Sequence, residues 1–224
     1  MMRFLYILCL GFFGLTNAEY CFNQVHNSCG IQGSDLPYCN AKYSGAHRVM
    51  PDLQEYVMQH LSHSFQYLLM STNFANYEKN REGFSKLYRK LSDSTWDDAI
   101  DLIKYVTKRG GVMQLDTEVP REPNSAFSKS YNMFELESLS RALDMHKSLA
   151  EKAHKIHSEV SKRSNDYHDA ETLSYLEKEF VHKHSDTIRD LAGYTNDLSN
   201  MLFKEVRDPS LSVFLFDEYL QKIA

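Results

Sequence analysis

The sequence lacks the features that mark several large classes of protein. No segment of its 224 residues shows sustained alternation of apolar and polar residues, which argues against a β-sheet core. Acidic and basic residues alternate and form no basic patch, so neither nucleic acid nor an anionic membrane is indicated as a partner. No apolar run after the N-terminal segment could span a bilayer, and no Asn-x-Ser/Thr site for N-glycosylation occurs. With 42% hydrophobic and 25% charged residues, the composition is that of one globular domain.

The first 18 residues have the pattern of a signal peptide. Arg3 supplies the positive charge, Phe4 to Leu15 an apolar stretch, and Thr16-Asn17-Ala18 a cleavage site of small residues. The apolar stretch is shorter than the roughly 20 residues of a membrane span. A buried N-terminal helix is the alternative. We therefore predict that residues 1–18 are removed and that the protein enters the secretory pathway and is extracellular.

Three cysteines remain after the signal peptide: Cys21, Cys29 and Cys39. Cysteines in an oxidising compartment are usually paired, and an odd number favours one intrachain disulfide plus one cysteine for another subunit. A zinc site is less favoured, because no fourth ligand has finger-like spacing. Residues 19–48 are thus a cysteine-containing N-terminal extension, and residues 49–224 form a helical domain.

Helical periodicity of apolar residues dominates that domain. It predicts four long helices and a short fifth one, from Pro51 to about Asn80, from about Gly83 to Arg109, from about Asn132 to Lys162, from about Asp169 to Phe203, and from Leu211 to Ile223. The fifth helix is apolar nearly all round, so it should be buried against other subunits.

The lengths of the connections predict the topology. Short links join the first helix to the second and the third to the fourth, which makes each pair an antiparallel hairpin. About 20 residues, from Gly111 to Tyr131, lie between the hairpins and can span the whole length of a bundle. The predicted fold is all-α, a four-helix bundle with one long crossover and a short fifth C-terminal helix.

One polar residue interrupts the apolar stripe of each long helix, near its middle. These residues are His60, Asp98, His146 and His184. If they converge in one layer, three imidazoles and a carboxylate could bind a divalent metal in the bundle core. The alternative is a set of buried groups that hydrogen-bond to one another, to Tyr67 and Thr95, and to trapped water.

Two further patterns concern metal chemistry. Glu151 with His154, and Glu179 with His182, match the Glu-x-x-His spacing of di-iron bundles, but both pairs lie off the apolar stripe and should be on the surface. Carboxylates also recur every four residues along the second helix, at Asp93, Asp97 and Asp101. Such a row is usually a solvated face, yet on the inner wall of a hollow shell it could concentrate Fe(III).

Several runs resemble the ferritin family over almost the whole mature chain. They are Ser64–Ser71 (Ser-Phe-Gln-Tyr-Leu-Leu-Met-Ser), Lys108–Gly111, Arg189–Leu198 and Phe214–Asp217. The signal peptide, the three cysteines and the C-terminal run that begins at Asp208-Pro209 look like the light-type subunit of secreted insect ferritins. The resemblance implies a ferritin-like fold and a 24-subunit shell that stores ferric iron. It also implies a homologous heavy subunit as disulfide-linked partner.

The resemblance also implies where the iron-oxidising centre of heavy ferritin subunits would lie. Its three glutamates fall on His60, Thr95 and His146, its histidine on Asp98 and its glutamine on His184, while its tyrosine is kept as Tyr67. Two iron ions need bridging carboxylates, and one aspartate cannot replace three glutamates. We therefore expect no ferroxidase activity, with oxidation left to the heavy subunit.

Other family positions are only partly matched. The nucleation region of light subunits includes Lys86, Arg89 and Lys90 here, with acidic character kept at Asp93 and Asp97. In the iron channel at the three-fold axis, Glu177 matches a family carboxylate, whereas the other channel position holds Ser174, and His157 matches a histidine near that entry route.

The leading hypothesis is an iron-storage shell subunit that supports ferric mineral nucleation. The alternatives are a variant metal-binding or ferroxidase enzyme that uses the His/Asp layer, and a secreted helical signalling bundle.

Overall fold

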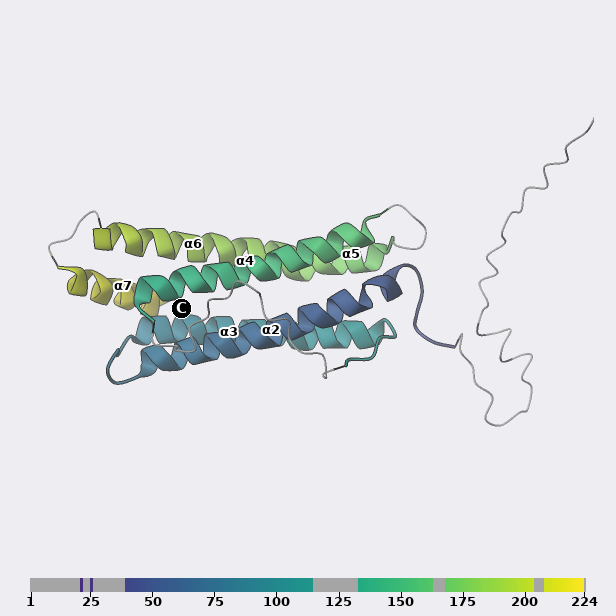
Figure 1. Ribbon diagram of the computed structural model, residues 1–224, viewed down its shortest axis with the longest axis horizontal. Helices are drawn as coiled ribbons and strands as arrows, with labels where there is room; N and C mark the ends of the chain where they lie inside the picture. Colours follow the sequence, from purple (N-terminus) through teal and green to yellow (C-terminus); the bar gives the residue numbers. More distant parts are fainter. Residues whose placement is uncertain are drawn as a thin grey trace, which may run out of the picture. The chain divides into compact units, whose positions relative to one another are not determined.

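The computed structural model describes Cys21, Val25 and residues 39–114, 133–162, 168–203 and 208–223. It forms two compact units, residues 1–41 and 42–224. All regular elements of the described residues are helical (Figure 1): α2 (Ala46–Ala75), α3 (Glu82–Lys108), α4 (Glu135–Val160), α5 (Ala170–Leu176), the π-helical η1 (Glu177–Val181), α6 (His182–Phe203) and α7 (Pro209–Ile223). The predicted fold class is confirmed.

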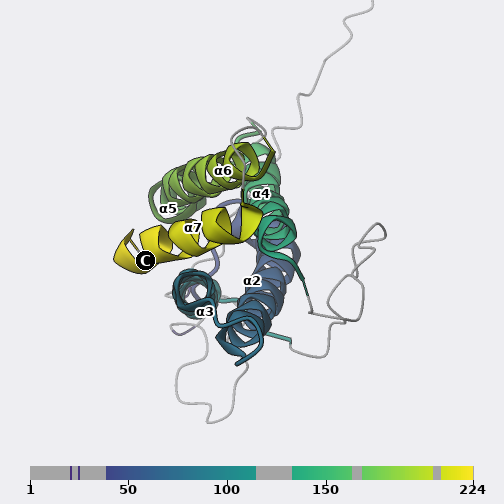
Figure 2. The ribbon, with the colours of Figure 1, turned by 90° about the vertical axis from the view of Figure 1, so that its left-hand side faces the viewer.

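Four helical rods form the bundle. α2 packs against α3 and α4, and α4 packs against α5, η1 and α6 (Figures 1 and 2). A short link at residues 76–81 reverses the chain between α2 and α3, with Asn80 in the left-handed region at φ 50°. α3 ends where predicted, before Gly110, whose φ of 76° suits a glycine that terminates a helix.

The two hairpins are joined along the full length of the bundle. Arg109, just after α3, forms a buried ion pair of 2.8 Å with Asp169, just before α5. Glu135, at the start of α4, instead pairs with Arg81, just before α3, at 3.2 Å. The chain therefore leaves α3 at one end and enters α4 at the other, as the predicted crossover requires. Residues 115–132 of that crossover lie outside the described residues.

The first and fourth helices differ in detail from the prediction. α2 begins at Ala46, so Pro51 lies inside it. Because proline has no N–H, the hydrogen bond to the carbonyl of His47 is missing. The fourth rod contains η1, a π-helical turn. Thr172, Leu176, Phe180 and His184 are all buried although each is four residues from the next, a spacing that drifts off one face at 3.6 residues per turn. A turn with more residues, as in η1, keeps them aligned.

The bundle core consists of two apolar clusters with a polar layer between them. One cluster lies toward α7 and includes Phe74, Phe84 and Leu198. The other lies toward the opposite end and includes Leu53 and Leu102. Along each helix the predicted polar residue falls between the two clusters, so these residues lie at mid-bundle depth.

α7 lies across the end of the bundle, against α3 and α6 (Figures 1 and 2). The Asp217 carboxylate accepts a hydrogen bond of 3.0 Å from the backbone N–H of Phe84 in the first turn of α3. A Cβ at Gly83 would lie 2.1 Å from the Asp217 carbonyl oxygen, so this close approach requires glycine. Leu211, Phe214 and Leu215 of α7 remain exposed in the single chain, as expected for a helix that packs against other subunits.

In the N-terminal unit, Cys21 and Cys39 form a disulfide. Cys29 lies outside the described residues. Among the helices that the structure describes, none is long and apolar enough to cross a membrane.

Candidate functional site

Three of the four polar residues at mid-bundle come together. His60 of α2, His146 of α4 and His184 of α6 are buried, with exposed fractions of 0%, 5% and 1%. The ring centroid of His184 lies 5.1 Å from that of His146 and 5.9 Å from that of His60. The predicted convergence of the imidazoles is therefore present. Whether they bind metal depends on which of their nitrogen atoms are free.

Hydrogen bonds engage both nitrogens of His184 and both of His146. The Tyr56 hydroxyl lies 2.6 Å from Nε2 of His184, and Nδ1 of His184 lies 3.3 Å from Nε2 of His146. Nδ1 of His146 then lies 3.4 Å from the Tyr67 hydroxyl, which donates to the Ala142 carbonyl at 3.1 Å. One donor direction fits the whole row: Tyr56 to His184 to His146 to Tyr67 to Ala142. We call this row the core chain.

The core chain leaves few lone pairs for a metal. His60 donates from Nδ1 to the Tyr56 carbonyl at 2.9 Å, and its Nε2 has no partner in the described structure. Nδ1 of the neighbouring His63, 7% exposed, also lacks a partner. In the part of the chain that the structure describes, no group of three or more His, Cys, Asp or Glu side chains is arranged to hold a metal ion. Metal binding by the layer stays a prediction.

Burial keeps these histidines neutral. It lowers the pKa of His60, His146 and His184 to about 3 each, and that of His63 to about 4. Neighbouring imidazoles and the Lys183 ammonium lower the pKa values of His60, His146 and His184 further, because a second positive charge nearby disfavours protonation. A neutral imidazole has one N–H and one lone pair, which is the form that the core chain requires.

Asp98, the fourth predicted residue, is held by a lysine. Its Oδ1 lies 2.6 Å from Nζ of Lys183, and its side chain is 14% exposed. Burial raises the pKa of Asp98, while the hydrogen bond and the charge of Lys183 oppose that effect. The only carboxylate among the four predicted residues is thus neutralised by an ammonium group.

Sequence reasoning missed two members of this region, Tyr56 and Lys183, and misplaced one. Tyr56 could have been found, since it lies one helical turn before His60 on the same face. Lys183 could not, because it is adjacent to His184 in the sequence and its long side chain folds back toward α3. Thr95, expected to bond within the layer, instead donates to the Leu91 carbonyl of its own helix at 2.7 Å.

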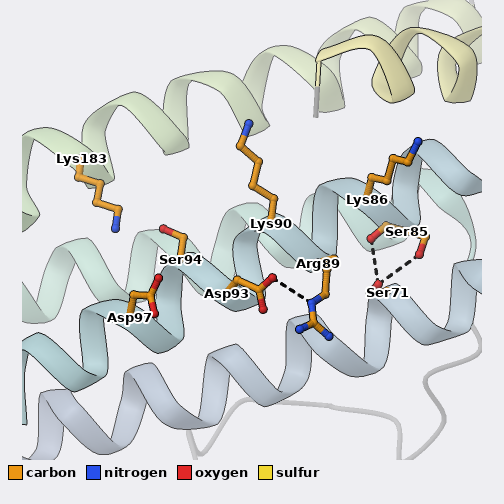
Figure 3. A pocket seen from close by; sticks show the side chains of 9 residues that line it. All are labelled: Ser71, Ser85, Lys86, Arg89, Lys90, Asp93, Ser94, Asp97 and Lys183. Carbon is orange, nitrogen blue, oxygen red and sulfur yellow. Dashed lines mark hydrogen bonds and ion pairs between the residues drawn. The ribbon is translucent and has the colours of Figure 1, made fainter.

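A second region of interest is an open groove between α3 and α6, with a volume of about 680 Å³ (Figure 3). Its lining is Ser71 of α2, Ser85, Lys86, Arg89, Lys90, Asp93, Ser94 and Asp97 of α3, and Lys183 of α6. Asp93 and Asp97, two of the three predicted nucleation residues, therefore share one groove. The third, Asp101, is not in the lining and pairs with Lys104 at 2.9 Å.

The remaining predicted positions are on the surface. Nε2 of His157 lies 2.8 Å from Oε1 of Glu177, so the structure brings the two predicted channel residues together. The π-helical turn begins at Glu177 and leaves it exposed. The two Glu-x-x-His pairs are exposed, which confirms the prediction that they do not enter the core.

These features define a class of protein: a bundle with one crossover, a short helix across its end and a polar layer at mid-depth. The family model of the ferritin-like domain matches residues 52–201. The chain belongs to the ferritin family, and it is an iron-storage subunit.

Its relatives narrow the kind of ferritin that it resembles. A ferritin light chain of Trichoplusia ni is 45% identical over 215 residues, 93% of each chain. A ferritin light chain of Drosophila melanogaster is 41% identical over 217 residues, 96% of this chain and 95% of the relative. The crystal structure of Trichoplusia ni secreted ferritin superimposes with a TM-score of 0.84 at 43% identity, covering 92% of this chain and all of that chain.

Proposed function

We propose that this chain is a light-type subunit of a secreted ferritin shell, one that holds ferric mineral but does not oxidise iron. In this proposal it assembles with a ferroxidase-active heavy subunit into a 24-subunit shell. Its own contribution is to complete the wall and to supply carboxylates on which the mineral starts.

The hydrogen bonds of the core chain support the absence of ferroxidase activity. Oxidation of paired Fe(II) ions requires several oxygen ligands that bind and bridge the two metals. In the described core, His184 and His146 use their nitrogen atoms in hydrogen bonds with each other and with tyrosines. Asp98 is occupied by Lys183. An Fe(II) ion would have to break these bonds before it found ligands.

A metal site of a different kind is not favoured by any observation at this layer. The unpartnered Nε2 of His60 and Nδ1 of His63 offer two nitrogen atoms at most, and a stable site usually needs three or four ligands.

For nucleation we propose Asp93 and Asp97, with Asp101 one turn further along α3. Asp97 forms no ion pair within the described structure, so its oxygen atoms are available to a hard cation such as Fe(III). The proposal requires the groove to face the cavity of the shell. For iron entry we propose Glu177 and His157, whose exposed carboxylate and imidazole lie side by side.

We propose that residues 1–18, with their signal-peptide pattern, direct export and that the cysteines after them select the partner subunit. The Cys21–Cys39 disulfide leaves Cys29 for a bond to the heavy subunit. Replacing Cys29 by Ser should abolish the disulfide-linked dimer on non-reducing gels of the secreted protein while the shell still assembles. A linked dimer that persists in Cys29→Ser would contradict the assignment. Cys21→Ser is the matched variant, in which Cys39 is released and disulfide scrambling is expected.

The test of the proposed function is the oxidation of Fe(II) by shells made of this subunit alone. Fe(II) is added without oxygen, oxygen is then admitted, and the initial rate is followed by absorbance. We expect the rate of a protein-free solution, and the same rate for His146→Ala. Oxidation well above that rate, lost in His146→Ala, would establish the layer as an enzyme. Shells that also contain heavy subunits give the positive control.

A further inference from the structure

The charges along the groove on α3 are segregated. Lys86, Arg89 and Lys90 lie toward the start of the helix, whereas Asp93, Asp97 and Asp101 lie further along it. Lys86 and Lys90 are four residues apart, so two like charges occupy neighbouring turns of one face. Glu82 offsets the charge of Lys86 at 2.9 Å, which leaves Lys90 without an ion-pair partner in the described structure. Lys183 adds a fourth cationic side chain from α6, and its Nζ points across the groove toward α3 (Figure 3).

The cations of the groove differ in their partners. Arg89 is paired with Asp93 at 2.9 Å, Lys86 with Glu82 at 2.9 Å, and Lys183 with Asp98 at 2.6 Å. Lys90 forms no ion pair within the part of the chain that the structure describes, and its side chain extends from α3 into the space between α3 and α6 (Figure 3). Lys90 is one helical turn from Asp93 and Ser94, and two turns from Asp97, which is also unpaired.

We infer that the groove binds a small tetrahedral oxyanion, of which inorganic phosphate is the representative, at Lys86 and Lys90. Lys ammonium groups bind phosphate oxygen atoms through short, charge-assisted hydrogen bonds. The Ser94 hydroxyl, one turn from Lys90 and in the same lining, offers a neutral donor. The groove is open and about 680 Å³, ample for a hydrated small anion.

The position of the anion beside the carboxylates gives it a chemical role. Fe(III) is a hard cation that binds oxygen ligands, and both carboxylate and phosphate oxygens qualify. An iron ion on Asp93 and a phosphate on Lys90 would lie about one turn apart, near enough to share an oxygen. The first mineral formed on this subunit would then be a ferric phosphate. This role rests on the proposed function; the binding of the anion does not.

The experiment measures binding of radiolabelled inorganic phosphate to iron-free assembled shells by equilibrium dialysis at physiological salt. Three proteins are compared: wild type, Lys86→Gln with Lys90→Gln, and Lys147→Gln with Lys155→Gln. The last pair lies exposed on α4, outside the groove, and removes the same charge. We expect at least a tenfold loss of affinity in the groove variant and none in the α4 variant. Equal affinity in all three proteins would overturn the inference.

Two further comparisons test the selectivity of the site for phosphate and the role of the anion in mineral formation. Sulfate that displaces phosphate from wild-type shells supports a site for oxyanions in general, whereas phosphate that resists sulfate supports a site selective for phosphate. Asp93→Asn with Asp97→Asn should keep or raise the phosphate affinity, because it removes negative charge from the lining and releases Arg89. If that variant also forms mineral at the wild-type rate, the proposed nucleation role fails and the phosphate site stands. If the phosphate-to-iron ratio of the early mineral is unchanged in the lysine variant, the anion has no part in nucleation.

Discussion

The histidine layer in the core and the groove on α3 contain residue types that bind metals, yet they differ in what those residues have left to offer. In the core, the imidazoles of His146 and His184 are joined in a chain of hydrogen bonds and held neutral by burial. In the groove, Asp97 and Lys90 are solvated and unpaired within the described structure. A cluster of ligating residues is therefore not a site by itself. Whether such a cluster can bind a metal depends on its free lone pairs and its access to solvent.

Burial also explains why the two regions respond differently to change. A buried polar group that loses its partner cannot turn to water, so a substitution in the core chain costs free energy of folding. A solvated carboxylate or ammonium group can be exchanged with little effect on folding, so a substitution in the groove should change only what it binds. The following predictions separate the two regions.

Acid should have the largest effect, and it should act through the core. His60, His146 and His184 have pKa values of about 3 in the folded protein, against about 6.5 when unfolded. Between these values the unfolded chain binds more protons, so the free energy of unfolding falls as the pH falls from 6.5 toward 3, and this stabilisation is fully present above 6.5. Each histidine contributes up to about 1.4 kcal/mol per pH unit.

Denaturant unfolding of the shell at pH 6, 5 and 4 measures this slope. His60→Leu should make it shallower by about 1.4 kcal/mol per pH unit, and His154→Leu, at an exposed position, should leave it unchanged. Identical slopes for all three proteins would contradict neutral histidines in the core.

Breaking the core chain should have the next largest effect. His184→Leu leaves the Tyr56 hydroxyl and Nε2 of His146 without partners in a buried position. We expect a loss of about 3 kcal/mol in the free energy of unfolding, from two unsatisfied polar groups. The measurement is denaturant unfolding at pH 7, with His154→Leu as the surface control, expected within about 0.5 kcal/mol of wild type. A cost below about 1 kcal/mol for His184→Leu would mean that the chain contributes little.

Carboxylates of the groove should affect mineral formation without affecting folding. Asp93→Asn with Asp97→Asn removes both carboxylates from the lining. In shells that contain heavy subunits, we expect the growth of ferric mineral to slow several-fold while the unfolding midpoint changes little. Asp144→Asn, on the exposed face of α4, is the matched control. Unchanged mineral growth would remove these residues from nucleation.

The smallest effect is expected at His60. Its Nε2 has no partner, and its Nδ1 donates to the Tyr56 carbonyl, which also accepts the helical N–H of His60 itself. His60→Leu therefore replaces an incompletely bonded group by an apolar one and leaves no acceptor unpaired. Stability at pH 7 should change by less than about 1 kcal/mol or rise. A loss as large as that of His184→Leu would show that His60 belongs to the core chain.

Sequence periodicity was sufficient for the fold and for the depth of the polar layer. A polar residue within the apolar stripe of a helix faces the core like the stripe residues beside it. The mid-bundle position of His60, His146 and His184 therefore followed from their spacing along each helix. The partners did not follow. Lys183 of α6 pairs with Asp98 of α3, a contact between different helices. The partners of each hydrogen bond also depend on side-chain rotamers, which spacing does not encode.

Local backbone departures were also beyond the sequence pattern. The residues at Glu177–Val181 alone do not distinguish a π-helical turn from an α-helical one. The four-residue spacing of buried side chains from Thr172 to His184 spans a longer stretch, and η1 accommodates it. The start of α2 at Ala46 precedes the predicted start at Pro51, because proline is favoured in the first turn of a helix but lies one turn further in here.

Anomalous diffraction at the iron edge from iron-soaked crystals of the assembled shell would show where iron binds. We predict iron density in the groove beside Asp93 and Asp97 and none among the imidazoles of the core layer. Density between His60, His146 and His184, with the groove empty, would contradict this prediction.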